Sequence, residues 1–377
     1  MLVSKKECVG CGNCSLVCKH GAITFNKDSE GFFYPSINES KCVGCNMCEK
    51  VCPLLENPND EKCLSDIAKA YSGYINNEEL DSCASGGVST AISKKFIDDN
   101  GWVAGVEFSD DFTFCRYKLT NKKEEIESFK GSKYIQVRNE KIFYLIREKL
   151  INNEKVLFFG TPCNIKALLK IVNKLDWREN LFIVELICHG PTSELLLEKF
   201  IKEKRIDKIS KINFKNKHNG WENPSLQIIH SDGEYLEPLY NSEFGYGFLN
   251  FTRLSCYNCY FKDKKRESDL IVGDYWGIDK NNISFNDHGV SAIIVNSSKG
   301  KKLIENLTDF IIFESSIDNI SKGNYNLFQK RKKPLLRIIY SKKLRKKGIK
   351  LAYIKSEKGF YSIYTKVKKT IKKILGR

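Results

Sequence analysis

The sequence predicts a mixed α+β and α/β protein in three parts: a cysteine-dense N-terminal unit, a larger core and a basic helical tail. Three observations indicate this division. Residues 1–60 carry eight of the 15 cysteines, and residues 61–329 alternate between strand-like and helix-like apolar segments. Residues 330–377 hold 19 Lys and Arg but a single acid. The hydrophobic share of 41% and the charged share of 29% are typical of a globular chain.

The N-terminal unit contains a repeated cysteine pattern, C-x2-C-x2-C-x3-C. The copies begin at Cys8 and Cys42, and Pro53 follows the second copy. This is the spacing of two-cluster bacterial ferredoxins, in which the fourth cysteine of each motif ligates the other cluster. Glycines in the loops let the backbone bend around each cubane. The pattern therefore predicts two 4Fe–4S clusters, one on Cys8, Cys11, Cys14 and Cys52, the other on Cys42, Cys45, Cys48 and Cys18.

Zinc is the alternative for these cysteines, because paired C-x2-C motifs also bind zinc. In a reducing compartment, clustered cysteines favour metal ligation over disulfides. The first motif departs from the usual pattern, since Lys19 replaces the proline after its last cysteine. We expect this cation to raise the reduction potential of the neighbouring cluster slightly.

The core alternates strands and helices. Apolar runs predict strands over residues 102–108, 155–160 and 181–188. Helices are expected over residues 85–99, 164–172 and 193–204. These strand–turn–helix units favour parallel pairing.

After residue 208 the pattern favours antiparallel pairing. A hairpin is expected at Ser231-Asp232-Gly233, between residues 226–230 and 234–239. Further strands are expected over 269–277 and 291–296, and a helix over 299–307. We expect domains over residues 1–60, 61–329 (parts of about 65–160 and 161–329) and 330–377, with the first boundary near Asn59.

A second set of cysteines falls in the core. Cys163 follows one predicted strand and Cys188 ends the next, while a C-x2-C pair stands at Cys256 and Cys259. Consecutive parallel strands end at the same sheet edge, so these thiols can meet there and hold a third cluster. Buried structural thiols are the alternative. Core or incidental thiols are expected at the three remaining positions, Cys63, Cys83 and Cys115.

Six stretches between about residues 65 and 330 carry a family resemblance: SGGVSTAI, FKGSKYIQ, FFGTPCNIKAL, ICHGPTSELL, FKNKHNGW and SCYNCYFKDKKRESDLIVGDYWGI. Here the sequence resembles the coenzyme F-420 hydrogenase/dehydrogenase beta-subunit family, in which the two-cluster module is also frequent. The resemblance implies a flavin, FAD or otherwise FMN, with a 4Fe–4S cluster beside it. It therefore favours the third cluster and makes coenzyme F-420 a candidate substrate.

The resemblance also implies site residues. Its flavin-contact candidates, each with a plain loop residue as the alternative, are Ser85, Gly86, Gly87, Lys130, Gly131, Ser132, Lys133, Tyr134, Thr161 and Pro162. The candidates for catalysis are His189, Lys217 and Asp274. For His189 the alternative is a histidine that is buried in the core with its hydrogen bonds made. The sequence has neither G-x-G-x-x-G nor a P-loop pattern, so it predicts no Rossmann nicotinamide site and no P-loop site.

These features predict an iron–sulfur flavoprotein oxidoreductase. It would pass electrons between 4Fe–4S clusters and a flavin that reduces or oxidises an organic substrate or deazaflavin coenzyme. One alternative is a non-catalytic electron-transfer subunit of a larger redox complex. Another is a redox enzyme of polysaccharide biosynthesis at the membrane surface, since relatives occur with such genes. A redox partner protein or ferredoxin is an expected partner.

The net charge of +16 belongs to the tail, because residues 1–329 hold 43 basic and 45 acidic side chains. A nucleic-acid partner is therefore not expected. Apolar residues recur at helical spacing between Phe360 and Leu375, with lysines between them. This basic amphipathic helix predicts either contact with an anionic membrane or docking on the body. With no signal-peptide or membrane-spanning pattern, we expect a cytoplasmic protein, peripheral at the inner membrane surface if the tail binds lipid.

Overall fold

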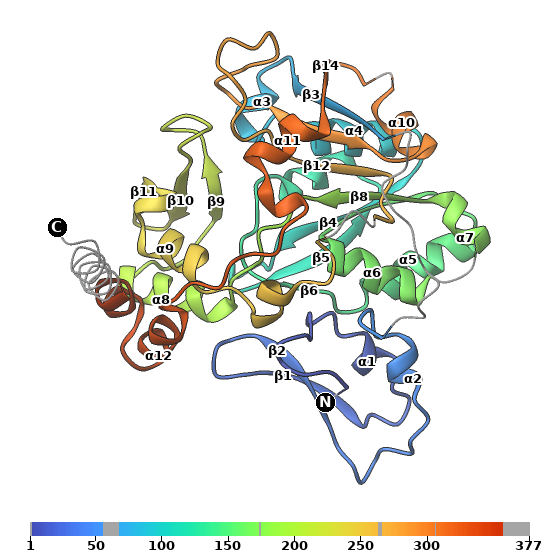
Figure 1. Ribbon diagram of the computed structural model, residues 1–377, viewed down its shortest axis with the longest axis vertical. Helices are drawn as coiled ribbons and strands as arrows, with labels where there is room; N and C mark the ends of the chain where they lie inside the picture. Colours follow the sequence, from blue (N-terminus) through green and yellow to red (C-terminus); the bar gives the residue numbers. More distant parts are fainter. Residues whose placement is uncertain (1, 56–67, 173–174, 263–265, 306, 357–377) are drawn as a thin grey trace, which may run out of the picture.

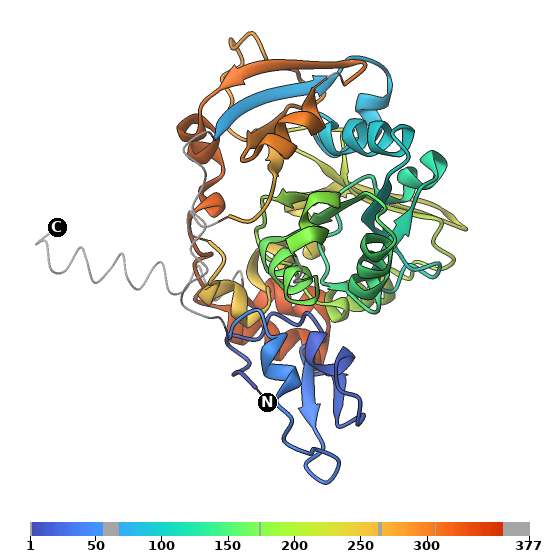
Figure 2. The same ribbon diagram turned by 90° about the vertical axis from the view of Figure 1, so that its right-hand side faces the viewer.

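The computed structural model describes residues 2–55, 68–172, 175–262, 266–305 and 307–356. The N-terminal unit holds α1 (Asn13–Leu16), β1 (Ile23–Lys27), β2 (Phe33–Ile37) and α2 (Met47–Lys50). β1 and β2 form an antiparallel pair in which Ile23 lies opposite Ile37. Figures 1 and 2 both show this unit at one end of the molecule, below the core.

A nine-stranded mixed sheet forms the centre of the core. Its strand order is β14-β3-β13-β12-β8-β7-β4-β5-β6. In chain order the strands are β3 (Lys69–Ile75), β4 (Trp102–Phe108), β5 (Cys115–Thr120), β6 (Val137–Arg138), β7 (Val156–Gly160), β8 (Leu181–Leu186), β12 (Leu270–Asp274), β13 (Ser291–Val295) and β14 (Phe310–Ser315). The central strands β4, β7, β8 and β12 are parallel. Their apolar runs fit burial on both faces.

Helices cover both faces of this sheet. Val156 and Phe158 of β7 face one apolar cluster, whereas Leu157 and Phe159 face another. The first cluster is completed by α5 (Ile142–Ile151) and α6 (Pro162–Ile171), and the second by α4 (Val88–Asp98) and α10 (Ser298–Ile304). The other helices are α3 (Glu79–Ser82), α7 (Leu175–Asn180), α8 (Glu194–Lys204), α9 (Glu243–Asn250), α11 (Ile317–Gly323) and α12 (Arg337–Lys347). Short 3-10 helices are η1 (Lys123–Phe129), η2 (Leu239–Asn241), η3 (Leu254–Asn258) and η4 (Tyr325–Leu327).

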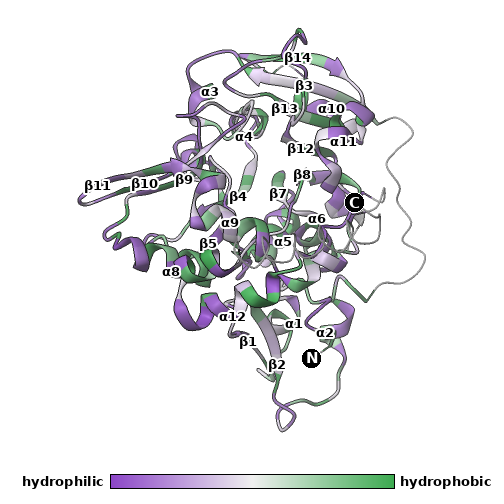
Figure 3. Cartoon of the chain, turned by 60° about the vertical axis from the view of Figure 1, so that its left-hand side comes forward, coloured by the Kyte–Doolittle hydropathy of each residue, from purple (hydrophilic) through white to green (hydrophobic). Residues whose placement is uncertain are grey.

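A separate antiparallel sheet projects beside the core. It consists of β9 (Lys211–Asn216), β10 (Ser225–His230) and β11 (Gly233–Pro238). Figure 3 colours much of this arm as hydrophilic. Its inner residues Phe214, Leu226 and Ile228 are buried in an apolar cluster with residues of α8 and α9.

Most of the expected elements occur where the sequence predicts them. β4 spans the expected 102–108, and the hairpin pairs Ser225 with Pro238. The expected strand over 269–277 is shorter and ends at Asp274. The antiparallel expectation beyond residue 208 is wrong for one pairing, because β12 runs parallel to β8. β3 was not expected as a strand, although it joins β13 and β14 in the large sheet.

The first part of the basic tail packs against the protein. Tyr340, Leu344, Ile349 and Ala352 are buried in the same cluster as Phe251. Residues 349–356 are also helical. No helix among the described residues is both long and apolar enough to cross a bilayer. The amphipathic helix predicted over 360–375, the boundary near Asn59 and Cys63 lie outside the described residues.

Candidate iron–sulfur and redox site

Four cysteines of the N-terminal unit surround one pocket. Its cysteine lining consists of Cys8, Cys11, Cys14 and Cys52. The fourth of these comes from the second motif, so the chain brings together the set that the ferredoxin spacing groups. We call these residues the inner set.

The other four cysteines lie farther outward. Cys42 and Cys45 are exposed, and Cys18 and Cys48 are half-buried. We call these four the outer set. Both motifs share a backbone feature, since α1 and α2 each begin after a residue with positive φ: Gly12 at 81° and Asn46 at 58°. This backbone conformation, which favours glycine and asparagine, lets each loop turn sharply just before its third cysteine.

The donor chemistry of the inner set fits an iron–sulfur cluster. Burial, and then the neighbouring thiolate of Cys8, raises the pKa of Cys14 to about 12. Buried thiolates so close together need a compensating positive charge, which cluster iron supplies. Within the described residues, no three His, Cys, Asp or Glu side chains are placed to hold a single metal ion.

The core cysteines also meet. Cys163 lies in the first turn of α6, Cys188 follows β8, and Cys256 lies in η3 just before Cys259. The pKa of Cys256 is raised by burial first and then by the charges of Cys188, Cys163 and Cys259, which all act on its thiol. Burial and the nearby Cys188 raise the pKa of Cys163 to about 12. We call this group the core set.

A glycine allows two of these thiols to approach. Gly190 has a φ of +88°, and a Cβ there would lie 3.1 Å from the Cys256 Sγ. Its backbone N–H donates to the Cys188 Sγ at 3.3 Å. The Thr161 hydroxyl lies 3.3 Å from the Cys163 Sγ, and Pro162 opens α6 at the position that suits a proline. By contrast, Cys83 and Cys115 are buried in apolar clusters.

Polar side chains dock the inner set on the core. The Asn13 amide donates to the Ala167 carbonyl of α6 at 2.8 Å. The Asn139 amide donates to the Cys11 carbonyl at 3.0 Å. Arg253, which immediately precedes η3, donates to the Cys8 carbonyl at 2.8 Å. The inner set is thus held against two of the three segments that carry the core set, α6 and η3.

The glycine turn at Ser85, Gly86 and Gly87 packs tightly against the sheet. A Cβ on Gly86 would lie 2.2 Å from the Gly73 carbonyl oxygen of β3. The Ser85 hydroxyl donates to the Val290 carbonyl at 2.8 Å. The Lys217 ammonium donates to the Ser85 carbonyl at 3.2 Å and to that of Leu80 at 2.5 Å. This contact places Lys217 at the start of α4.

The loop over residues 130–134 lies next to this turn. The Lys130 ammonium contacts Glu79 and the Ser82 hydroxyl, both at 2.8 Å. Lys133 folds back on its own loop, donating to the Lys130 carbonyl at 2.7 Å. Burial lowers its pKa to about 8. The Tyr134 ring stacks on Phe248 with a centroid distance of 4.2 Å. Burial and then the charge of Asp274 raise the pKa of Tyr134, whereas a hydrogen bond with Ser132 lowers it.

Asp274 is the centre of a buried polar group. The Lys215 ammonium lies 3.0 Å from its carboxylate, and the lysine side chain is fully buried. The Trp221 N–H donates to the same carboxylate at 3.4 Å, and Trp221 stacks on Trp276. Burial lowers the pKa of Lys217 to about 8, against the opposing effect of the nearby negative charges of Cys83 and Asp81.

His189 connects this group with the core set. Its Nδ1 lies 2.7 Å from the Asn326 amide nitrogen, and burial followed by the Lys262 charge lowers its pKa to about 4. Asp274 and Lys215 are among the charges that act on the ring. The imidazole is therefore neutral near pH 7. The three catalytic candidates His189, Lys217 and Asp274 thus lie in one charged region of the protein.

Sequence reasoning missed several residues of this region. Lys215 stands in the FKNKHNGW stretch, but nothing in the sequence separates it from 61 other Lys and Arg residues. Arg253 could have been suspected, because it lies three residues before Cys256. Asn13 and Asn139 carry no sequence signal, since their role depends on which surfaces meet.

Two family models match the chain. Residues 7–54 match the 4Fe–4S dicluster domain. Residues 153–317 match the coenzyme F-420 hydrogenase/dehydrogenase beta subunit, C terminus. The core of the chain therefore carries a domain similar to the C terminus of the coenzyme F-420 hydrogenase/dehydrogenase beta subunit, and a 4Fe–4S dicluster domain precedes it. This combination relates the chain to iron–sulfur oxidoreductases and to their electron-transfer subunits.

The chain is also similar in fold to a solved structure. It is a chain from the xenon-derivatised F-420-reducing NiFe hydrogenase complex of Methanosarcina barkeri, 16% identical with a TM-score of 0.50. The match covers 73% of the present chain and 92% of that chain. No curated protein matches the sequence.

Proposed function

We propose that the chain is an iron–sulfur flavoprotein oxidoreductase with three 4Fe–4S clusters, held by the outer, inner and core sets. The observation that carries the proposal is the meeting of four core cysteines from three separate segments beside the docked dicluster domain. When bound, such clusters exchange single electrons, and a flavin couples these to two-electron chemistry on an organic substrate or deazaflavin.

The exposure of the three sets supports this function. The outer set includes two exposed cysteines, the inner set is mostly buried, and the core set is half-buried. A redox partner protein or ferredoxin can therefore reach the outer set, whereas the inner set lies at the contact between the dicluster domain and the core. Clusters arranged in the order outer set, inner set, core set would carry electrons between the protein surface and the substrate.

The polar region around Asp274 supports the flavin part of the proposal. The turn at Ser85–Gly87, the loop over 130–134 and Lys217 converge there, and His189 links the region to the core set. Lys217 has a pKa of about 8, so a small change in its surroundings moves its proton near neutral pH. We assign flavin contact to the first two segments and proton handling to the three catalytic candidates.

The test is the content of iron, acid-labile sulfide and flavin in the anaerobically purified chain. We expect about twelve irons and one flavin per chain, since each cubane holds four irons. Screening deazaflavin and nicotinamide donors for flavin reduction then identifies the substrate class. About eight irons and no flavin after reconstitution would leave a ferredoxin-type carrier, the electron-transfer-subunit alternative.

The surface of α12 supports a second proposal, contact with an anionic membrane surface. Leu335, Ile338 and Ile339 are 81%, 67% and 44% exposed. Exposed lysines flank them at 332, 333, 342, 346 and 347. Exposed apolar side chains among cations are the combination that binds anionic headgroups and the acyl boundary. This location would suit a redox enzyme acting on membrane-linked substrates.

A vesicle-binding assay tests the membrane proposal. Removing all of residues 330–377 would strip buried side chains such as Tyr340 from the core, so the shortened chain should end at Ser356. We expect the double substitution L335S and I338S, combined with this truncation, to lower cosedimentation with phosphatidylglycerol vesicles at least tenfold. Iron and flavin contents should not change. Equal binding by the altered and unaltered chains, or equal binding to uncharged vesicles, would contradict the proposal.

A further inference from the structure

Arg253 is a buried cation that touches the inner set and precedes the core set. Its side chain is 1% exposed. The backbone carbonyl of Arg253 accepts from the Cys256 N–H at 3.1 Å. At the other end, the guanidinium Nε donates to the Cys8 carbonyl at 2.8 Å, and Nη2 lies 3.7 Å from the Cys8 Sγ. One residue therefore joins both cysteine sets.

The N-terminal unit is shaped to admit this guanidinium. A Cβ on Gly10 would lie 2.8 Å from the Arg253 Cζ, and Gly10 has a φ of +75°. The remaining donors of Arg253 reach the Phe33 carbonyl and the Gln136 side-chain oxygen, each at 2.9 Å. Tyr34 offers its ring face at 4.1 Å. These contacts fix the charge beside Cys8.

The charge of Arg253 has no carboxylate partner among the described residues. Its partners there are carbonyl, amide, ring and thiol groups. The nearby buried Arg337, by contrast, pairs with Glu30. Burying a cation without an opposite charge is strongly unfavourable, so a negative group is expected at the site. A cluster ligated by four thiolates carries such a charge.

We propose that Arg253 is the counter-charge of the cluster held by the inner set and raises its reduction potential. This rests on the assignment of those four cysteines to one cluster. A positive charge and an N–H directed at a ligand sulfur both stabilise an added electron, more strongly where the dielectric is low. Reduction adds one electron and moves no proton, because the guanidinium stays protonated.

Lys19 provides a matched comparison. It follows Cys18 of the outer set, as Arg253 lies beside Cys8 of the inner set, but Lys19 is exposed. Water and salt screen an exposed charge far more than a buried one. The rise in reduction potential that the sequence predicts from Lys19 should therefore be small. The larger rise should come from Arg253.

The test is an EPR-monitored redox titration of the full chain in four forms: unaltered, R253Q, R253K and K19Q. In R253Q we expect the reduction equilibrium constant of one ferredoxin cluster to fall at least tenfold, which is about 59 mV for one electron. R253K should restore more than half of this shift, and K19Q should change either constant less than threefold. An unchanged midpoint in an R253Q protein with full iron would overturn the proposal, as would an equal shift in K19Q.

If R253Q does not retain its iron, Q136E decides the question. It places a carboxylate against the guanidinium while Arg253 remains, so the same midpoint should fall. An unchanged midpoint there would overturn the proposal. Iron and flavin contents of the same samples report on the core set and the flavin separately. About eight irons and no flavin per chain would contradict the proposed function and still leave the ferredoxin midpoints measurable.

Discussion

Replacing Cys256 by serine is expected to remove about four irons per chain and to leave the two ferredoxin clusters in place. The charges of all three other core cysteines act on the Cys256 thiol. A serine hydroxyl stays protonated near neutral pH and is a poor iron ligand. The inner set lines a different pocket, so its cluster should not depend on this thiol.

Iron and sulfide analysis with EPR checks this prediction, and C83S is the matched control. Cys83 is also a buried thiol, but it lies in a small apolar cluster with the Thr90 hydroxyl 3.6 Å away. We expect C83S to keep about twelve irons, and C256S to keep about eight. Equal iron contents in C256S and the unaltered chain would show that the core set binds no cluster.

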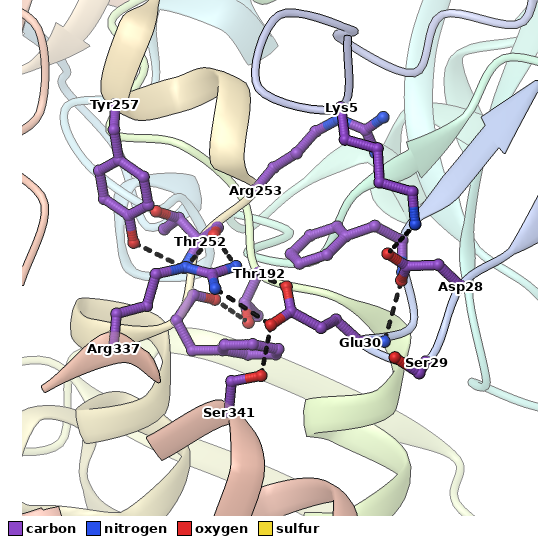
Figure 4. A network of polar contacts seen from close by, with 12 residues as sticks. Lys5, Asp28, Ser29, Glu30, Thr192, Thr252, Arg253, Tyr257, Arg337 and Ser341 are labelled. Atoms are coloured by element: carbon purple, nitrogen blue, oxygen red, sulfur yellow. Dashed lines mark hydrogen bonds and ion pairs between the residues drawn. The ribbon is translucent and has the colours of Figure 1, made fainter. Parts of the chain in front are cut away.

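Replacing Arg337 by alanine is expected to loosen the N-terminal unit by about 2–4 kcal/mol, because it breaks a buried ion pair. The guanidinium is 3% exposed and binds both oxygens of Glu30, at 3.1 and 2.7 Å. It also donates to the Thr252 carbonyl, next to Arg253. Ser341 of the same helix contacts Glu30 as well (Figure 4). The change would leave the carboxylate half-buried without its cation.

The pH dependence of this effect follows from Glu30. Burial alone would raise its pKa, but the hydrogen bonds from Arg337 and Ser341 and the Arg337 charge bring the pKa below its usual value. A carboxyl whose folded pKa is depressed contributes stability above its unfolded pKa of about 4.3. That contribution is lost as the pH falls through the folded value. The difference between R337A and the unaltered chain should therefore be largest near pH 7 and shrink in acid.

Hydrogen exchange of the N-terminal unit measures this loosening without requiring a single unfolding transition of the whole chain. The double variant R337Q with E30Q is the control, because it removes both charges and leaves two groups able to hydrogen-bond. We expect it to recover most of the protection lost in R337A. Faster exchange in the double variant than in R337A would show that the ion pair is not what holds the unit.

The local elements were predictable because each depends on a short stretch of sequence. β4 and β7 follow from apolar runs, and α6 from its periodicity after Pro162. The hairpin at Ser231-Asp232-Gly233 follows from its turn residues. β3 was missed because its seven residues include Ser72 and Gly73, and it becomes a strand only by pairing between β13 and β14.

The sequence by itself determined the ferredoxin spacing, the resemblance to the F-420 hydrogenase/dehydrogenase beta subunit and the basic character of the tail, because each is a pattern of residue types along the chain. Only the tertiary structure decided which side chains meet across long separations. Cys8 and Arg253 are 245 residues apart, and Glu30 and Arg337 are 307 apart. Such contacts depend on how the N-terminal unit, the core and α12 pack together. A buried charge becomes recognisable only when that packing shows what surrounds it.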